Sequence, residues 1–189
     1  MIVSLIHQTQ PMIINRTSLI GVFVLLISIL AHSQDNTASY IEKHKPLAID
    51  LMREYAIPAS VILGVAVIES GAGTSALSRE FNNDFGIVGT NSHSIQKLGH
   101  HTHYKEYEND SASFRHFCEI IARKPYYALL ICNPDPISWI NAIRKSGYAS
   151  ASHTWGKRVE MAIQKFNLTT IDLFVDPLNQ TARLLIPGH

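Results

Sequence analysis

The segment from Val61 to Ile68 reads VILGVAVI and would carry apolar side chains on every face of a helix. A helix that is apolar all round is buried on all sides by its neighbours, so this segment predicts a central helix. Pro58 suits its first turn, and the run from Ser70 to Gly73 (SGAG) ends it. The acidic residue Glu69 stands between the apolar run and this stop. The fold must therefore surround the helix and accommodate a carboxyl group at its end.

Helical patterns flank this segment, and they are interrupted once. Between residues 82 and 107 the helical periodicity disappears, and the glycines and short β-prone pieces there predict a small β-hairpin lobe. The expected fold class is α+β, with a mostly helical body. Four further helices are predicted from apolar spacing and caps: one from Ser39 that Pro46 should kink or restart, one capped by Asp110 or Ser111, one between Pro136 and Gly147, and one from Trp155 to Phe166.

The N-terminal segment has the features of a secretory signal. Arg16 precedes an apolar run of 13 residues, Leu19 to Ala31, and Ala31 and Ser33 are small residues suited to cleavage after Ser33. We expect a signal peptide over 1–33, one domain over 38–172 and a tail over 173–189. The protein would then be exported, periplasmic or secreted, without a stable membrane anchor. An uncleaved anchor is the weaker alternative, since a spanning helix needs about 20 apolar residues.

The composition argues against several classes of partner. Sixteen Lys and Arg residues face 15 Asp and Glu residues, which gives no electrostatic reason to expect nucleic acid or anionic lipid. Neither a nucleotide-binding glycine motif nor a paired CxxC is present, and no metal or organic cofactor is expected. His100, His101 and His103 lie in the expected lobe, with His93 nearby. Alternate strand positions would place His101 and His103 on one face, which would suit a metal ion, but a solvated surface is the favoured interpretation.

The two cysteines leave two alternatives open. Cys118 and Cys132 are close enough in sequence for a disulfide bridge after export to an oxidising compartment. A buried, unpaired Cys118 on the apolar face of a helix is equally compatible with the pattern.

Glu69 is the candidate for chemistry. Poor solvation at the end of an apolar helix disfavours its charged form, and the negative end of the helix dipole acts in the same direction. Both effects raise its pKa, as a general acid near neutral pH requires. Protonation of a leaving oxygen by a carboxylic acid is the central step of glycoside cleavage. A glutamate that only reaches solvent where the helix surfaces is the plain alternative.

The residues after Glu69 carry a resemblance. The chain reads Glu-Ser-Gly-Ala-Gly-Thr-Ser-Ala-Leu from Glu69, and later Asn-Asp-Phe-Gly-Ile from Asn83. These segments resemble the glucosaminidases of glycoside hydrolase family 73, which usually show Glu-Ser/Thr-Gly-x-Gly-x-Ser-x-Leu and then Asn-x-Phe-Gly-Ile. The similarity continues in order over roughly residues 40–172, which is more specific than a short motif. The later matching positions are Tyr107, Ser113 to Arg115, Tyr126, Tyr127, Trp139, Gly147 to Ser150 and Phe166 to Leu168.

The resemblance implies a lysozyme-like fold and hydrolysis of the β-1,4 bond after N-acetylglucosamine in peptidoglycan glycan strands. It makes Glu69 the general acid, and Tyr148 the tyrosine that supports the reacting centre. A packed aromatic with its hydroxyl bonded to backbone is the alternative for Tyr148, and a turn-fixing role is the alternative for Asn83. The candidate substrate-binding residues are Ser75, Asn83, Phe85 and Tyr126.

Three departures from the family pattern bear on mechanism. Val65 stands where many members have glutamine, and Ala72 where many have an aromatic residue. No acidic residue lies between Asp84 and Glu106, so Glu106 is the nearest candidate for a second catalytic carboxylate. Lytic transglycosylase-like cleavage needs only one glutamate and is one alternative. A non-catalytic peptidoglycan-binding module is the other.

Overall fold

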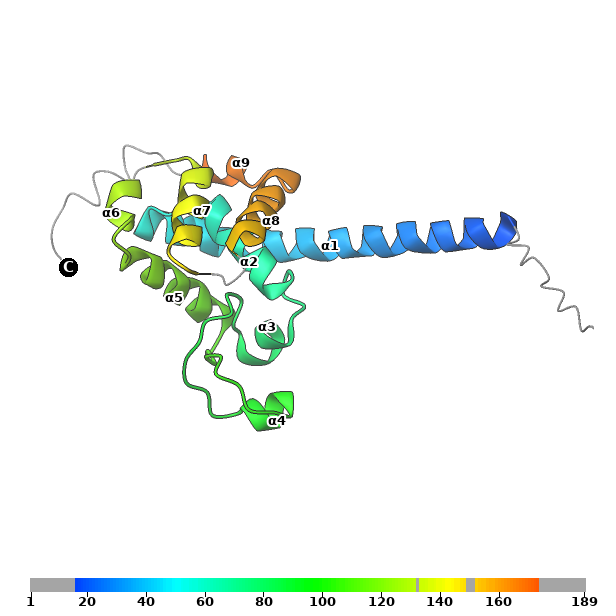
Figure 1. The fold of residues 1–189 in the computed structure, drawn as a ribbon, viewed down its shortest axis with the longest axis horizontal. Helices are drawn as coiled ribbons and strands as arrows, with labels where there is room; N and C mark the ends of the chain where they lie inside the picture. The colour runs from blue at the N-terminus through cyan, green and yellow to red at the C-terminus, as the bar shows by residue number, and fades with distance from the viewer. Residues whose placement is uncertain (1–15, 132, 149–151, 174–189) are drawn as a thin grey trace, which may run out of the picture. The chain divides into compact units, whose positions relative to one another are not determined.

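The computed structural model describes residues 16–131, 133–148 and 152–173 (Figure 1). The chain divides into two units, residues 1–35 and 36–189. Of the first unit only the helical backbone of residues 16–35 is described, and it begins helix α1 (Arg16–Tyr55). Residues 1–15 of the expected signal peptide and 174–189 of the expected tail lie outside the described residues. Within the described segments, no helix combines the length and hydropathy that crossing a bilayer requires.

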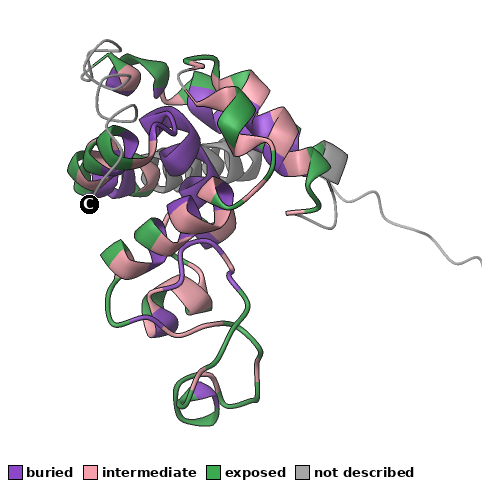
Figure 2. Cartoon of the chain, turned by 90° about the vertical axis from the view of Figure 1, so that its left-hand side faces the viewer, coloured by how far each residue is buried: buried purple, intermediate pink, exposed green. Residues whose placement is uncertain are grey.

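Helix α2 (Ala59–Ser70) is the central helix that the sequence predicts. Every residue from Ala59 to Val67 is buried, and Figure 2 shows the buried positions concentrated in the helical body. The predicted central position of the apolar segment is confirmed. The main helical neighbours of α2 are α5 (Asp110–Ala122), α7 (Pro136–Lys145), α8 (Ser152–Lys165) and α9 (Thr169–Asp172). The short helices are α3 (Ala76–Phe81), α4 (Ser94–Leu98) and α6 (Tyr127–Leu130).

The close approach of α2 to α8 depends on Gly64. A Cβ atom at Gly64 would lie 2.8 Å from Cγ1 of Ile163 and 3.3 Å from Cγ1 of Val159, both buried. We expect Gly64→Ala to lower the free energy of unfolding by about 1–2 kcal/mol, because overpacking outweighs the gain in helix propensity. The matched control is Gly156→Ala, which meets mainly the flexible Arg144 side chain. Thermal melts of both variants would contradict this reading if Gly64→Ala were the more stable of the two.

Two of the expected helix starts are wrong. Ser39 does not begin a helix, because α1 runs without interruption from Arg16 to Tyr55 with Pro46 inside it. Helix α5 is capped by Asn109, whose side chain accepts a hydrogen bond from the Ala112 amide at 2.9 Å, and not by Asp110 or Ser111. The start of α7 agrees with the sequence: Asp135 accepts from the amides of its first turn and Pro136 is its first residue.

The expected β-hairpin is not shown in the lobe, which we define as residues 82–109. Its described backbone contains one isolated antiparallel bridge, Val88 to Tyr104, together with α4 (Figure 1). Beside this bridge, the amides of Gly89 and Lys105 donate to the carbonyls of His103 and Ile87, and asparagine side chains supply further bonds across the lobe. Asn83 accepts from the Ile87 amide and donates to the carbonyls of Ile87 and Lys105, while Asn91 donates to the carbonyls of Thr102 and Tyr104. The lobe is therefore an irregular loop fixed from within.

Candidate active site

A cleft of about 690 Å³ opens between the lobe and the helical body. Glu69 is the acidic residue among its described lining residues, and most of the others are aromatic or aliphatic. The lining residues are Glu69, Leu77, Phe85, Gly86, Ile87, Val88, Tyr104, Ile120, Tyr148, Thr154, Trp155 and Arg158. The central helix thus brings its terminal carboxyl group to a groove.

Glu69 is held by Trp155. The indole Nε1 of Trp155 donates a hydrogen bond to Oε1 of Glu69 at 2.6 Å, from α8 to the last turn of α2. Burial raises the pKa of the Glu69 carboxyl, while the Trp155 hydrogen bond and the positive charge of Arg158 lower it. The net direction is upward, as expected from the sequence. The dipole of α2 points the same way, because Gly71 ends the helix directly after Ser70 with φ +59°.

The second oxygen of Glu69 faces the cleft near Gly86. A Cβ atom built at Gly86 would lie 3.7 Å from Oε2, and no hydrogen-bond partner for this oxygen is found in the described part of the chain. Gly86 has φ +61°, a conformation that side chains rarely adopt. The Phe-Gly-Ile segment therefore brings its backbone close to the carboxyl group without a side chain in between. One oxygen of Glu69 is anchored, and the other is left to meet a ligand.

Tyr148 combines a cleft position with a structural bond. Its hydroxyl donates to the carbonyl of Phe85 at 3.0 Å, which ties the Phe-Gly-Ile segment to the helical body. The centroid of its ring lies 5.6 Å from the centroid of the Trp155 ring and 5.8 Å from the centroid of the Phe117 ring. Burial and the nearby Glu69 raise the pKa of the phenol, so it stays neutral. Phe85 also lines the cleft, but its ring is buried and stacks on Phe117.

Glu106 lies outside the described lining of the cleft. Its carboxylate pairs with Lys97 at 2.7 Å and with His93 at 2.9 Å, within the lobe. These two hydrogen bonds lower the pKa of Glu106 to about 2. Asp84, the other acidic residue near the motif, is buried beside α1, where it accepts from the hydroxyls of Tyr40 and Ser78. Neither carboxylate is therefore brought into the cleft with Glu69.

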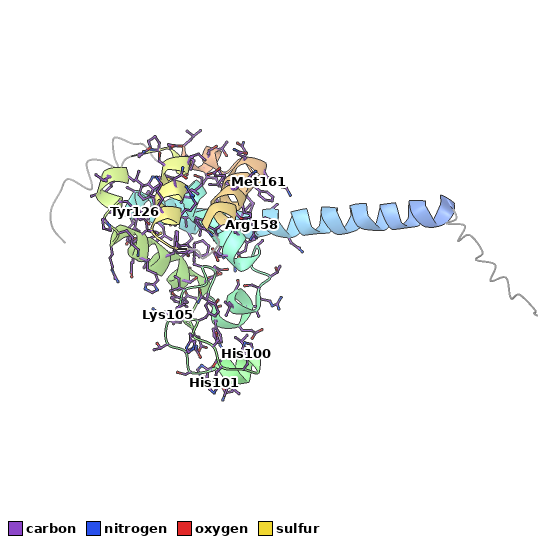
Figure 3. All side chains as sticks on the ribbon, viewed as in Figure 1. His100, His101, Lys105, Tyr126, Arg158 and Met161 are labelled. Atoms are coloured by element: carbon purple, nitrogen blue, oxygen red, sulfur yellow. The ribbon has the colours of Figure 1, made fainter. Side chains whose placement is uncertain are left out.

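Three of the candidate substrate-binding residues have structural contacts instead of cleft positions. Ser75 caps α3 by accepting from the Ser78 amide at 3.1 Å. Asn83 is buried and uses both ends of its amide inside the lobe. Tyr126 packs against the core beside α6, and Figure 3 shows it well separated from Arg158. None of the three is among the described residues that line the cleft.

Val65 and Ala72, which depart from the family pattern, do not line the cleft either. Val65 is completely buried inside α2, where a glutamine would need hydrogen-bond partners. Ala72 follows the helix end with φ +55° and packs partly against the core.

The histidines of the lobe are dispersed. His93 pairs with Glu106, and Nδ1 of His100 lies 3.0 Å from the carbonyl of Leu98. Figure 3 shows His100 and His101 beside α4 at the end of the lobe. No group of three metal-binding side chains occurs among the described residues. Cys118 is a free, buried thiol in α5, which agrees with the second of the two alternatives, and Cys132 lies outside the described residues.

The cleft wall opposite the lobe consists of residues that no motif in the sequence marks. The apolar spacing of Trp155 indicates only a core position, and its neighbours Thr154 and Arg158 have no local signal of a ligand contact. The signal that the three residues share is their spacing, since positions 154, 155 and 158 share one face of α8. Tyr104 in the lobe is 38% exposed and also lines the cleft, and no motif in the sequence marks it.

Comparisons with known proteins identify the family of the chain. The family profile described as mannosyl-glycoprotein endo-β-N-acetylglucosaminidase matches residues 45–168. The chain belongs to this glucosaminidase family, and it is a glycoside hydrolase. The family recognised from the sequence is thereby confirmed. No curated protein matches the chain.

Three solved structures share the fold. The catalytic domain of the autolysin Auto from Listeria monocytogenes has a TM-score of 0.54 at 19% identity, over 72% of this chain and 87% of that one. The glycoside hydrolase domain of FlgJ from Salmonella typhimurium has a TM-score of 0.54 at 16% identity, over 78% and 97%. A type VI secretion system effector–immunity complex from Pseudomonas protegens has a TM-score of 0.53 at 16% identity, over 70% of this chain and 94% of that one. The mostly helical, lysozyme-like part of the expected fold is confirmed.

Proposed function

We propose that the protein is a peptidoglycan hydrolase that cleaves the β-1,4 bond after N-acetylglucosamine, with Glu69 as its general acid. The observation that carries the proposal is the state of Glu69 in the cleft. Its pKa is raised by burial, Oε1 is held by Trp155, and Oε2 faces the open space beside Gly86. A protonated carboxyl group positioned in this way donates its proton to the leaving glycosidic oxygen. Peptidoglycan as the substrate is supported by the family and by the autolysin neighbour.

The second catalytic group is proposed to be either the substrate's own 2-acetamido group or a water molecule, and not a second carboxylate of the protein. Glycosidases with two carboxylates need them about 5–9.5 Å apart across the bond, and the described lining of this cleft offers only Glu69. The 2-acetamido oxygen of N-acetylglucosamine, or a water molecule held by Tyr148, would then attack the sugar carbon. The Tyr148 hydroxyl donates its hydrogen bond to the backbone carbonyl of Phe85, so its oxygen remains available as an acceptor for such a water.

The walls of the cleft suit a sugar chain. Val88 and Tyr104 expose apolar surface on the lobe side, while Trp155 and Thr154 line the opposite side on α8. Tyrosine rings offer a flat apolar face together with a polar edge, which is a suitable contact for a pyranose ring. We propose Tyr104 as a substrate contact in addition to Phe85.

Trp155→Phe should move the pH profile in a defined direction. The indole hydrogen bond lowers the pKa of Glu69. When it is lost, only the charge of Arg158 still counters the increase in pKa that burial causes. The pKa of the acid therefore rises, and the alkaline limb of kcat/KM moves to higher pH. The matched control is Trp139→Phe, which removes an indole bond to the Asn133 carbonyl in the core, outside the cleft lining. A limb that stays in place in Trp155→Phe, or moves equally in both variants, would contradict the assigned role.

We propose export as the location of this activity, since peptidoglycan lies outside the cytoplasmic membrane. Cleavage after Ser33 would give a mature chain that begins at Gln34. Intact-mass analysis of the protein recovered from outside the cytoplasm measures this start directly. A mass that still includes Leu19 to Ala31 would instead favour an anchored protein.

Digestion of purified sacculi separates the proposal from its rivals. A glucosaminidase releases soluble fragments with N-acetylglucosamine at the new reducing end. Lytic transglycosylase-like cleavage gives anhydro-muramic ends, and a binding module releases nothing. Mass spectrometry of the products, before and after reduction of free ends, distinguishes all three outcomes.

A further inference from the structure

Arg158 stands out among the arginines of the domain because its guanidinium has no hydrogen-bond or ion-pair partner in the part of the chain that the structure describes. The other arginines described between residues 36 and 173 each bond or pair with a named group, whereas no hydrogen bond or ion pair of Arg158 is found among the described residues. These partnered arginines are Arg53 with Asp50, Arg79 with the Thr74 carbonyl, Arg115 with Glu54, Arg123 with Glu119 and Arg144 with Asn141. Arg158 is exposed and lines the cleft.

Arg158 influences the protonation of the Glu69 carboxyl group. It lies one helical turn after Trp155 on α8, and its charge lowers the pKa of Glu69. Figure 3 shows Arg158 on α8. It is the lone cation among the described lining residues, and the other titratable groups that line the cleft, Tyr104 and Tyr148, are phenols. An unpaired cation here disfavours the protonated acid in the empty enzyme, and a bound anion would remove this effect.

The chemistry of a guanidinium identifies the class of anion. Its planar fork of N–H donors matches a carboxylate in a bidentate arrangement, and such charge-assisted hydrogen bonds are stronger than neutral ones. The muramic side of peptidoglycan offers carboxylates of two origins. One is the lactyl group of muramic acid where the stem peptide has been removed, and the other belongs to the stem peptide itself. N-acetylglucosamine oligomers offer none.

We infer that Arg158 binds a carboxylate of the substrate, so that the cleft favours muramic-acid-containing glycan over neutral N-acetylglucosamine oligomers. The inference rests on the proposed function and deepens it, because it assigns the part of the substrate that the α8 wall recognises. Occupation of Arg158 by the carboxylate would neutralise the positive charge that lowers the pKa of Glu69. The acid would then hold its proton to a higher pH in the complex than in the free enzyme.

The test compares the full-length protein with Arg158→Met and Arg158→Lys on three substrates: sacculus glycan with stem peptides, the same glycan after amidase treatment, and N-acetylglucosamine oligomers. The measured quantity is the ratio of kcat/KM on each acidic glycan to that on the neutral oligomers, or the ratio of Kd values from competition where oligomer cleavage is slow. The matched control is Lys157→Met, an exposed cation on the same helix that does not line the cleft.

We expect Arg158→Met to lower this ratio by about tenfold to a hundredfold, as the loss of a charge-assisted hydrogen bond does, with partial recovery in Arg158→Lys. Lys157→Met should leave the ratio unchanged. A fall confined to the amidase-treated glycan identifies the lactyl carboxylate, and a fall confined to the stem-bearing glycan identifies the stem. An unchanged ratio in Arg158→Met, with wild-type cleavage of the glycans intact, overturns the inference alone. A wild-type protein that cleaves none of the three overturns the proposed function and the inference with it.

Discussion

Glu69→Gln is expected to lower kcat/KM on purified peptidoglycan glycan by about 10²–10⁴-fold or more, the usual contribution of general acid catalysis. The amide keeps the volume of the side chain, and its oxygen can still accept from Trp155. It cannot donate the catalytic proton. Glycan binding and folding should therefore stay nearly intact, which a thermal melt and a binding measurement would establish.

The matched control for this variant is Glu106→Gln. Both changes convert a glutamate into its amide, but Glu106 lies among Lys97 and His93 in the lobe and not in the described lining of the cleft. Near-wild-type turnover by a folded Glu69→Gln variant would show that the central assignment is wrong.

Tyr148→Phe is expected to reduce kcat/KM by more than about tenfold, while Glu106→Gln should cost less than about tenfold. Loss of the hydroxyl removes the bond that fixes the Phe85 carbonyl and the acceptor proposed for the attacking water. Glu106 pairs with two side chains that are each more than one third exposed, and such exposed ion pairs add little to the stability of the fold. Its pKa near 2 also makes it a weak base.

These two variants decide between one catalytic carboxylate and two. The measurement is kcat/KM on purified glycan, together with melts that exclude misfolding. A loss in Glu106→Gln as large as that in Glu69→Gln would restore a conventional two-carboxylate mechanism. A loss in Tyr148→Phe that is fully explained by a lower melting temperature would reduce Tyr148 to a structural role.

The helical body could be predicted because its signals are local. An uninterrupted apolar segment such as Val61 to Ile68 has one favourable location, and Asp135 with Pro136 is a complete helix start. The lobe could not, because its form depends on side-chain bonds between distant residues. Asn83 reaches Lys105, and Asn91 reaches Tyr104, and neither bond has a periodic signature.

The candidate site, like the fold, could be predicted from the sequence only in part. The position and raised pKa of Glu69 follow from an apolar helix that ends at a carboxylate, which is visible in the sequence. For motif residues such as Ser75 and Asn83, the sequence does not distinguish a structural role from substrate binding, because helix caps, turns and ligand contacts use the same kinds of side chain. Trp155 at helical spacing is indistinguishable from a core residue until α8 is placed against the end of α2.

Digestion of sacculi in water enriched in heavy oxygen, followed by identification of the new glycan ends, tests the proposal that Glu69 drives hydrolysis after N-acetylglucosamine. We expect N-acetylglucosamine at the reducing end, with one heavy oxygen taken from water, and no such product from Glu69→Gln. Anhydro-muramic ends without heavy oxygen, or equal product from Glu69→Gln, would contradict it.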